Sequence, residues 1–382
     1  MSNNLLYQHI NILLILLFTN SVILFSQSDT LEYNAKIIEV EALRTEQSKI
    51  LNHLNIQRVE ITEIDKLNMT NLTEKIKFLP NIFIRDYGGV GGIKTISMRG
   101  AAASQTAIMI DGIPISSSQN SLVDFSSLPL NYFESIDVIT NGSSSLYGTN
   151  SIGGTINLQS KIPQKKSIDL TASLGSYGYS NYSISSNSKV FKFPFFVNID
   201  YLNSKGDYSF KYNDFGEVKT KKRQNSDMTS LNSSVGIEIP MKNSLLSTKF
   251  FLINSQRGVP GAVILGKIEN SSARMDESKL FNISNLYTII DSNKYNELKL
   301  LLSYNSIDYS DSEFLPNDNF ANSYFISRDI KLIDDFTINW ENTSQVATLN
   351  FQYSNLTSNK LSLDVGNYVE RLNLGIGYNI SH

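Results

Sequence analysis

Side chains that commonly carry out catalysis or bind metals are few in this chain, and they are scattered. The 382 residues include no cysteine, which excludes thiolate catalysis, disulfides and cysteine-ligated metals. They include three histidines, which are His9, His53 and His382. Neither the Gly-x-Ser-x-Gly turn of serine hydrolases nor the His-Glu-x-x-His pair of zinc proteases occurs. We therefore expect no enzyme, and no metal ion or cofactor at a catalytic site.

Carboxylates offer one further option for metal binding. Asp207, Asp214 and Asp227 lie in one long polar stretch. A calcium ion needs about six to eight oxygens that converge from the fold, so solvated loop acids are the favoured interpretation and a calcium site the lesser one. The formal net charge is −3, so the chain has no excess of basic residues that would favour nucleic acid, and we expect no nucleic-acid partner.

The most specific pattern in the chain is an ordered series of turn-forming motifs between residues 79 and 158. Glycine permits positive φ and a close approach of the backbone, so the glycine clusters predict compact loops rather than a flexible linker. The motifs are Leu79-Pro80-Asn81-Ile82, Gly88-Gly89-Val90-Gly91-Gly92, Ser97-Met98-Arg99-Gly100, Met109-Ile110-Asp111-Gly112-Ile113-Pro114-Ile115, Leu146-Tyr147-Gly148 and Ile152-Gly153-Gly154-Thr155-Ile156-Asn157-Leu158.

Asp111 is the one acidic residue in these motifs that resembles a catalytic carboxylate. It stands next to Gly112 between two apolar runs, Ala107–Ile110 and Ile113–Ile115. An Asp-Gly pair in that setting predicts a tight hairpin-like bend, which gives Asp111 a structural role. Gly153-Gly154 likewise predicts a bend into the strand that follows.

Short helices and strands must position these turns. We expect a strand at Val59–Thr62, a helix starting near Thr62, and a second helix that Thr70 opens and Pro80 closes. Further strands are predicted where short apolar runs are bounded by Gly, Pro, Asn or Ser. They are Ile82–Arg85, Thr95–Arg99, Ala107–Ile110, Ser135–Thr140 and Thr155–Gln159. Residues 50–160 are thus predicted to form a small mixed α/β domain.

From residue 165 onward the sequence alternates between apolar and polar residues in short runs. Such runs occur at Ile168–Leu174, Phe195–Tyr201, Leu231–Ile239, Leu298–Tyr304, Phe336–Trp340, Ala347–Tyr353 and Leu372–Tyr378. A soluble β-sandwich gives similar alternation. Long polar insertions at Asp207–Asp227 and Gly258–Leu280, against tight links such as Pro240–Asn243, favour an antiparallel transmembrane β-barrel with one polar and one apolar face.

The order and spacing of the turn motifs resemble the plug domain of TonB-dependent outer-membrane receptors, and the spacing from Leu79 to Gly100 most resembles the cobalamin receptor branch. Two barrel segments, Arg223-Gln224-Asn225-Ser226-Asp227 and Arg257-Gly258-Val259-Pro260-Gly261, are also similar to that branch. The resemblance gives structural roles in the plug to Arg99, Gly100, Asp111, Gly112, Tyr147, Gly148, Gly153 and Gly154. It also implies two ligand-binding apices, which comprise Tyr87, Gly88, Gly89, Ile93, Ser116, Ser117, Ser118, Gln119 and Asn120.

The chain departs from the branch at two places. Thr140-Asn141-Gly142 replaces the usual Arg-Gly-Pro, which calls into question a charge contact between plug and barrel and hence their coupling. Asn81 replaces a glycine, and since asparagine tolerates left-handed backbone, folding is expected to survive.

The resemblance implies a TonB-type energy-transducing partner that docks ahead of the plug. Residues 28–49 form a polar extension, and the candidate docking segment (TonB box) within it comprises Ile37, Ile38, Glu39, Val40, Glu41 and Ala42. An extended segment can add as a strand to a partner's sheet edge through main-chain hydrogen bonds. An ordinary first strand of the plug is the alternative.

Residues 1–27 are predicted to be a signal peptide, because the apolar run from Ile10 to Phe25 is shorter than a spanning helix needs. The segment before it carries His9 but no lysine or arginine, so a retained anchor or a buried helix stays open as an alternative. Export would deliver the protein to the outer membrane of a Gram-negative bacterium, where its barrel contacts lipid.

About 218 residues follow Gln164, enough for on the order of ten to fourteen strands, whereas a plugged barrel has about 22. Residues 165–382 are therefore expected to form roughly the first half of a barrel, in a fragment or truncated product. The implied function is active import of a scarce bulky ligand through plug gating. The alternative is a truncated receptor that acts only as a ligand-binding or adhesive surface protein. Cobalamin, a ferric siderophore, haem and an oligosaccharide all fit the scaffold.

Overall fold

The computed structural model describes residues 56–61, 72–77, 79–129, 132–140, 150–161, 166–261, 263–264, 267–268, 271–311, 322–340, 343–361 and 366–381. All of these belong to one compact unit, residues 46–382. The predicted signal peptide, the extension with its candidate docking segment Ile37–Ala42, and the plug residues Tyr147 and Gly148 lie outside the described residues.

The first part of the described chain is a small domain, called the plug below, with two sheets. A hairpin pairs β2 (Ile82–Asp86) with β3 (Lys94–Met98). A five-stranded sheet has the order β1-β6-β7-β4-β5, in which β4 and β7 are parallel and the other pairs antiparallel. Its strands are β1 (Ile56–Glu60), β4 (Thr106–Ile110), β5 (Ile113–Pro114), β6 (Phe133–Ile139) and β7 (Gly154–Ser160).

The five strands predicted between residues 82 and 159 are all present, with ends within two residues of the prediction. The strand predicted at Val59–Thr62 is wrong in position: β1 ends at Glu60, because Ile61 is helical and only 3% exposed. The second helix is present as α4 (Leu72–Ile76), which ends before Pro80. A 3-10 turn, η1 (Ala103–Gln105), leads into β4.

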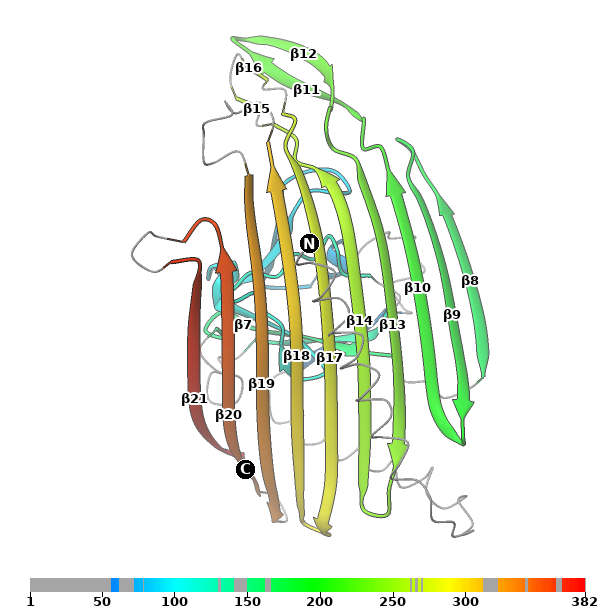
Figure 1. Ribbon diagram of the computed structural model, residues 1–382, viewed down its shortest axis with the longest axis vertical. Helices are drawn as coiled ribbons and strands as arrows, with labels where there is room; N and C mark the ends of the chain where they lie inside the picture. The colour runs from blue at the N-terminus through cyan, green and yellow to red at the C-terminus, as the bar shows by residue number, and fades with distance from the viewer. Residues whose placement is uncertain are drawn as a thin grey trace. The chain divides into compact units, whose positions relative to one another are not determined.

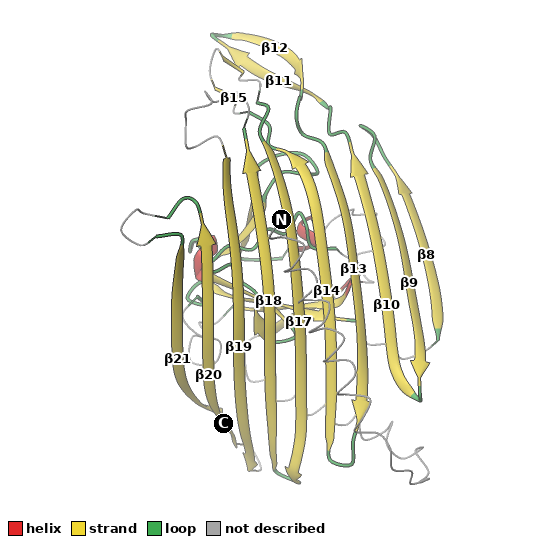
Figure 2. Cartoon of the chain, in the orientation of Figure 1, coloured by secondary structure: helices red, strands yellow, loops and turns green. Residues whose placement is uncertain are grey.

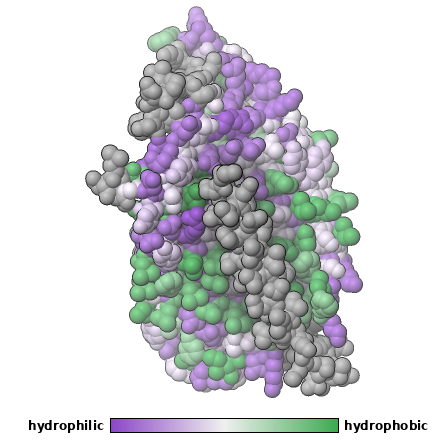
Figure 3. All heavy atoms as spheres, viewed as in Figure 1, coloured by the Kyte–Doolittle hydropathy of each residue, from purple (hydrophilic) through white to green (hydrophobic). Residues whose placement is uncertain are grey.

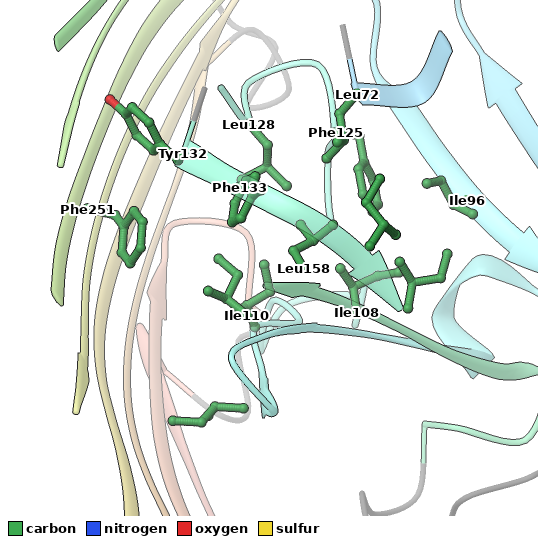
Figure 4. Packing of buried hydrophobic residues seen from close by; sticks show 14 of the residues in the cluster. Leu72, Ile96, Ile108, Ile110, Phe125, Leu128, Tyr132, Phe133, Leu158 and Phe251 are labelled. Carbon is green, nitrogen blue, oxygen red and sulfur yellow. The ribbon is translucent and has the colours of Figure 1, made fainter. Parts of the chain in front are cut away.

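Apolar side chains from the two helical segments and the strands form the plug core (Figure 4). Leu72 and Ile76 of α4 are fully buried, at the spacing of one helical turn, against strand residues such as Ile108 and Leu158. Phe251, which belongs to a later strand outside the plug, is part of the same cluster, and its ring centroid lies 6.0 Å from that of Tyr132. The plug and the later strands therefore share one apolar core.

The rest of the described chain is mostly strand (Figure 2). Ten antiparallel strands form one sheet in which sequence neighbours pair with each other, apart from short hairpins in the loops. They are β8 (Ser167–Leu174), β9 (Ser180–Val190), β10 (Phe193–Ser204), β13 (Met228–Pro240), β14 (Ser244–Gly258), β17 (Arg274–Asp291), β18 (Lys294–Ser310), β19 (Asn322–Trp340), β20 (Thr343–Ser358) and β21 (Tyr368–Ser381). Within the described residues the sheet is open, with β8 and β21 at its edges.

Two predictions about the insertions need correction. Gly258–Leu280 is not a continuous loop, because β14 runs to Gly258 and β17 begins at Arg274. Charged residues on the buried face of β17, Glu277 and Lys279, hid its strand pattern. The Asp207–Asp227 insertion contains its own hairpin of β11 (Ser209–Asp214) and β12 (Glu217–Lys222).

The two faces of the ten-stranded sheet have opposite chemistry. The inner face, which contacts the plug, buries charged residues, among them Lys249, Arg257, Lys279, Lys299, Asp329 and Lys331. The outer face, which points away from the plug, exposes apolar residues, among them Leu252, Leu302, Ile330, Leu332, Leu349, Phe351, Leu372 and Leu374. Apolar residues gather over the middle and lower parts of the strands in the view of Figure 3, and hydrophilic residues at the end that carries β11 and β12. This is the pattern of a transmembrane β-sheet.

A polar pair, Asp334 and Asn296, lies on the outer face among apolar residues. Asp334 lies opposite Leu298 and Leu349, midway along β19 between Arg328 and Trp340, and accepts a 2.6 Å hydrogen bond from Asn296 Nδ2.

The links between strands are short at one end of the sheet and long at the other. Two-residue and three-residue links join β9 to β10, β17 to β18 and β13 to β14, whereas β11, β12 and the small hairpin of β15 (Val263–Ile264) and β16 (Lys267–Ile268) lie at the opposite end (Figure 1). In transmembrane barrels the short turns face the periplasm and the long loops face outside. Among the described residues, no helix is both long and apolar enough to cross a membrane.

Candidate functional site

The Asp111-Gly112 turn joins the plug to the inner face of the sheet. Both residues have positive φ, 50° and 80°, and they close the hairpin in which Met109 pairs with Pro114, which confirms the predicted tight bend. The Asp111 carboxylate accepts hydrogen bonds from Ser160 N at 2.9 Å and Ser160 Oγ at 2.6 Å. It also forms an ion pair with Lys249 Nζ of β14 at 2.9 Å. The Asp111 carboxylate is therefore half of a buried ion pair between the plug and the sheet.

A second buried ion pair lies toward the long-loop end, where Asp124 Oδ2 is 2.7 Å from Arg257 Nη2. The other carboxylate oxygen accepts hydrogen bonds from the backbone N–H groups of Lys94 and Ser126, at 3.0 and 2.9 Å. Burial opposes ionisation of Asp124, but the charges of Arg257 and Lys279 and these hydrogen bonds together hold its pKa below the ordinary value. The carboxylate therefore stays charged against the sheet.

Arg257 connects this ion pair to the glycine cluster. Its Nη1 donates to Gly91 O at 3.2 Å and to Ser126 Oγ at 2.7 Å. The guanidinium thus binds two separate plug segments with its planar set of donors. A displacement of either segment must disturb the same side chain.

Further polar contacts come from β17 and β19. Asn285 Nδ2 donates to Asp111 O at 3.3 Å, and Lys331 Nζ donates to Pro114 O at 2.9 Å. Ser118 Oγ hydrogen-bonds the Asp329 carboxylate. The plug is therefore held by side chains from β14, β17 and β19.

The predicted apex at Tyr87–Ile93 is a compact loop. Tyr87 N donates to Ile93 O at 3.1 Å, and Lys94 Nζ donates to Gly89 O at 2.9 Å. A Cβ at Gly92 would lie 2.0 Å from the carbonyl oxygen of Gly88, so only glycine fits there. Tyr87 and Ile93 are 58% and 36% exposed, which leaves them open to a ligand.

The second predicted apex, residues 116–121, is held by local hydrogen bonds. Ser121 N donates to Ser117 O at 2.9 Å, and Gln119 N donates to Ser117 Oγ at 3.2 Å. Gln119 and Asn120 are exposed, whereas Ser116, Ser117 and Ser118 are partly buried. The exposed part of this apex is therefore its tip.

The remaining predicted plug residues lie at turns. Arg99 has φ 54° and donates from Nη1 to Thr140 O at 2.7 Å, and Gly100 follows with φ 76°. A Cβ at Gly153 would lie 2.7 Å from Ala101 Cβ, and Gly154 has φ 139°. Each glycine thus occupies a position that a larger residue would strain.

The two departures from the cobalamin branch have different outcomes. Asn81 has φ 63°, the left-handed conformation expected to be tolerated there. The loss of an arginine near Thr140 does not remove charge contact between plug and sheet, because Asp111–Lys249 and Asp124–Arg257 supply it elsewhere.

The three loop carboxylates considered for calcium each pair with a base. Asp207 lies 2.6 Å from Lys222, Asp214 2.5 Å from Lys219, and Asp227 2.8 Å from Arg274. No group of three or more potential metal ligands occurs in the described part of the chain.

Sequence reasoning missed the basic partners Lys249 and Lys331, and it noted Arg257 only as part of a similar segment. A usable signal was present, since a charged residue at every second position of an otherwise apolar strand faces the interior of a barrel. This signal does not indicate which plug residue Lys249, Arg257 or Lys331 contacts.

Comparison with known proteins agrees with this arrangement. The family model described as TonB-dependent Receptor Plug Domain matches residues 52–155. The vitamin B12 transporter BtuB of Vibrio cholerae serotype O1 is 30% identical over 150 residues, which cover 39% of this chain and 24% of BtuB. The chain thus spans about a quarter of the curated relatives it matches.

Solved receptors share the fold. The siderophore receptor PiuA of Acinetobacter baumannii superimposes with a TM-score of 0.58 at 14% identity, over 85% of this chain and 53% of PiuA. A mutant of the ferric enterobactin receptor PfeA of Pseudomonas aeruginosa gives 0.61 at 15% identity, over 82% of this chain and 51% of PfeA. Residues 52–155 are therefore a TonB-dependent receptor plug domain, and the chain as a whole shares the fold of the solved siderophore receptors.

Proposed function

We propose that the chain acts in the outer membrane of a Gram-negative bacterium as a receptor that imports a scarce, bulky nutrient of the cobalamin or ferric siderophore class. The relatives are named as a vitamin B12 transporter and as siderophore receptors, which supports this class. The opposite chemistry of the two sheet faces supports a membrane location.

In this proposal the ligand binds first to the long loops and to the two apices. Tyr87, Gly88, Gly89 and Ile93 form one contact surface, and residues 116–120 form the other. A TonB-type partner then pairs with Ile37–Ala42 as an added strand. Several main-chain hydrogen bonds in parallel resist a pull along the strand, so force reaches the plug.

The observation that carries the proposal is the position of Arg257. It forms an ion pair with Asp124 at 2.7 Å and hydrogen-bonds Gly91 O, within the apex loop, at 3.2 Å. A ligand that shifts the apex loop would therefore disturb a buried ion pair between plug and sheet. The Asp111–Lys249 pair would be the second contact to break as the plug rearranges. No covalent step is required.

Uptake by intact cells tests the proposal. The full chain is produced in a Gram-negative strain that lacks its own cobalamin and siderophore receptors, and accumulation of labelled cyanocobalamin and of ferric siderophores is measured. We expect Val40→Pro to abolish uptake, because proline removes a main-chain donor, and Val40→Thr to retain it. Ligand that binds to cells but never accumulates would reject transport in favour of a surface-binding role. Equal uptake by Val40→Pro and the parent would reject the docking segment.

A further inference from the structure

The outer face of the ten-stranded sheet carries a carboxylate among its apolar side chains. Asp334 lies between Leu332 and Phe336 on that face of β19, because alternate residues of a strand share a side. The nearest charge on the same face of β19 is Arg328, which is about 20 Å away along the strand. Arg328 also contacts another group, since its Nη1 donates to Asn355 Oδ1 at 3.4 Å. Within β19, Asp334 therefore has no basic neighbour on the outer face.

Asn296 of β18 is the polar residue that Asp334 contacts, and the two strands lie side by side in the sheet (Figure 1). Asn296 Nδ2 donates to Asp334 Oδ1 at 2.6 Å and to Asp335 O at 3.4 Å. From the described part of the chain, Asp334 Oδ2 and Asn296 Oδ1 accept no hydrogen bond. A carboxylate can accept about four hydrogen bonds and an amide oxygen about two. The pair therefore retains acceptors for a group outside this sheet.

Other polar side chains on the outer face are neutral and pair with each other. Ser244 Oγ lies 2.9 Å from Thr288 Oγ1, and Thr248 Oγ1 lies 2.8 Å from Ser284 Oγ. A hydroxyl that is hydrogen-bonded costs far less in an apolar solvent than a carboxylate does. Ionisable side chains inside a membrane are rare and commonly mark a functional contact with a polar partner. The carboxylate of Asp334 is therefore the polar group on this face that most requires a partner.

We propose that the Asp334–Asn296 pair is the centre of an interface with a second copy of this chain. A two-fold interface is self-complementary, so residue i of one copy meets residue j of the other, and j meets i. The 2.6 Å hydrogen bond places the amide and the carboxylate at one depth in the membrane. A two-fold axis along the membrane normal preserves that depth and brings Asn296 of the partner subunit to Asp334 Oδ2, with the reverse contact made at the same time. A second copy thus supplies donors where the pair has acceptors.

Apolar side chains around the pair complete the surface. Leu298 and Leu349 lie opposite Asp334 on the two neighbouring strands, and Leu349 is 54% exposed. Moving such side chains from lipid to protein gains little, because lipid tails are equally apolar. The polar pair therefore determines which part of the outer face meets the second copy. This inference rests on the membrane location proposed above, and it is independent of the ligand and of import.

Cysteine cross-linking of the full chain in phosphatidylcholine vesicles tests the interface. The chain has no cysteine, so Leu298→Cys provides a single thiol beside the pair. Ile199→Cys is the control, because Ile199 is 43% exposed on β10, which β13, β14 and β17 separate from β18. Both proteins are oxidised at the same protein-to-lipid ratio, and the covalent dimer is measured by gel electrophoresis. We expect Leu298→Cys to form several-fold more dimer than Ile199→Cys.

Further changes in the Leu298→Cys chain separate the pair from its surroundings. Asp334→Leu with Asn296→Leu is expected to weaken dimerisation by about ten-fold, given the usual strength of hydrogen bonds between membrane segments. Asp334→Asn is expected to retain the dimer, because two amides also offer donors and acceptors to each other. Thr248→Val with Ser284→Ala removes a hydroxyl pair from the same face and is expected to cross-link like the parent.

Three results would overturn the interface. They are equal cross-linking by Leu298→Cys and Ile199→Cys, unchanged cross-linking after the pair is replaced by leucines, and a cross-link in intact cells to a different protein with no dimer. Urea titration in the same vesicles checks that each variant folds. A chain that folds into vesicles without forming the dimer would reject the interface and leave the proposed membrane location standing.

Discussion

The inner and outer faces of the ten-stranded sheet belong to the same strands yet follow opposite rules. Lys331 and Leu332 are neighbours in β19, but the lysine is 5% exposed and the leucine 37% exposed. In a protein surrounded by water the exposures would be reversed. The comparison teaches that on this sheet burial marks contact with the plug, and that the exposed apolar residues follow the pattern of a lipid-facing surface.

Removing a charge from the inner face is expected to have the largest effect. Arg257→Leu leaves the Asp124 carboxylate buried and unpaired, which costs about 3–5 kcal/mol of plug stability. Since the chain has no cysteine, Ala107→Cys, at a site that is 3% exposed in β4, provides a single thiol whose labelling rate in urea reports opening of the plug. Adding Asp124→Asn to Arg257→Leu is expected to restore part of the loss. Unchanged labelling in Arg257→Leu would show that the ion pair does not hold the plug.

Adding a charge to the outer face is expected to have the next largest effect. Leu332→Lys places an ammonium group in the apolar band and costs about 2–4 kcal/mol of folding free energy in a bilayer. The matched change nearer the long-loop end, Ile326→Lys, is expected to cost about 0–1 kcal/mol. Urea titration of folding into lipid vesicles measures both. Equal costs at the two positions would contradict assignment of this face to lipid.

Removing the polar pair from the outer face is expected to have the smallest effect, with the opposite sign. Asp334→Leu combined with Asn296→Leu extends the apolar band and is expected to stabilise the chain in lipid vesicles by about 1 kcal/mol. Asp334→Leu alone leaves Asn296 Nδ2 with only its 3.4 Å hydrogen bond to Asp335 O and should gain less. A loss of stability in the double variant would show that the pair is needed on that face.

Much of the plug could be predicted from sequence because its strands are short apolar runs between turn residues. The Asp111-Gly112 hairpin and the left-handed Asn81 are local features, and both predictions are confirmed. Lys249, the partner of Asp111, lies 138 residues away, and no local pattern links the two. The candidate site was therefore predicted as loops, while the ion pairs that tie those loops to the sheet were not.

The sheet was harder to predict where its inner face is charged. β17 mixes Glu277 and Lys279 on the buried side with polar residues on the other, so alternation of apolar with polar residues fails as a signal. β9 was missed for a related reason, since its sequence is rich in serine and asparagine on both faces. Strands such as β20 and β21, with regular outer-face leucines, were found.

The plug sheet and the ten-stranded sheet also differ in how far apart their paired strands lie in the sequence. In the ten-stranded sheet each strand pairs with the next one made, so the sheet can grow hairpin by hairpin through contacts that are close in sequence. The plug sheet has the order β1-β6-β7-β4-β5, and Arg58 of β1 meets Asp137 of β6 across 79 residues. Its central strand, β7, ends at Ser160, only seven residues before β8 begins at Ser167. The plug sheet can thus close only when its whole length is present, and the first hairpin of the ten-stranded sheet follows directly after it in the sequence.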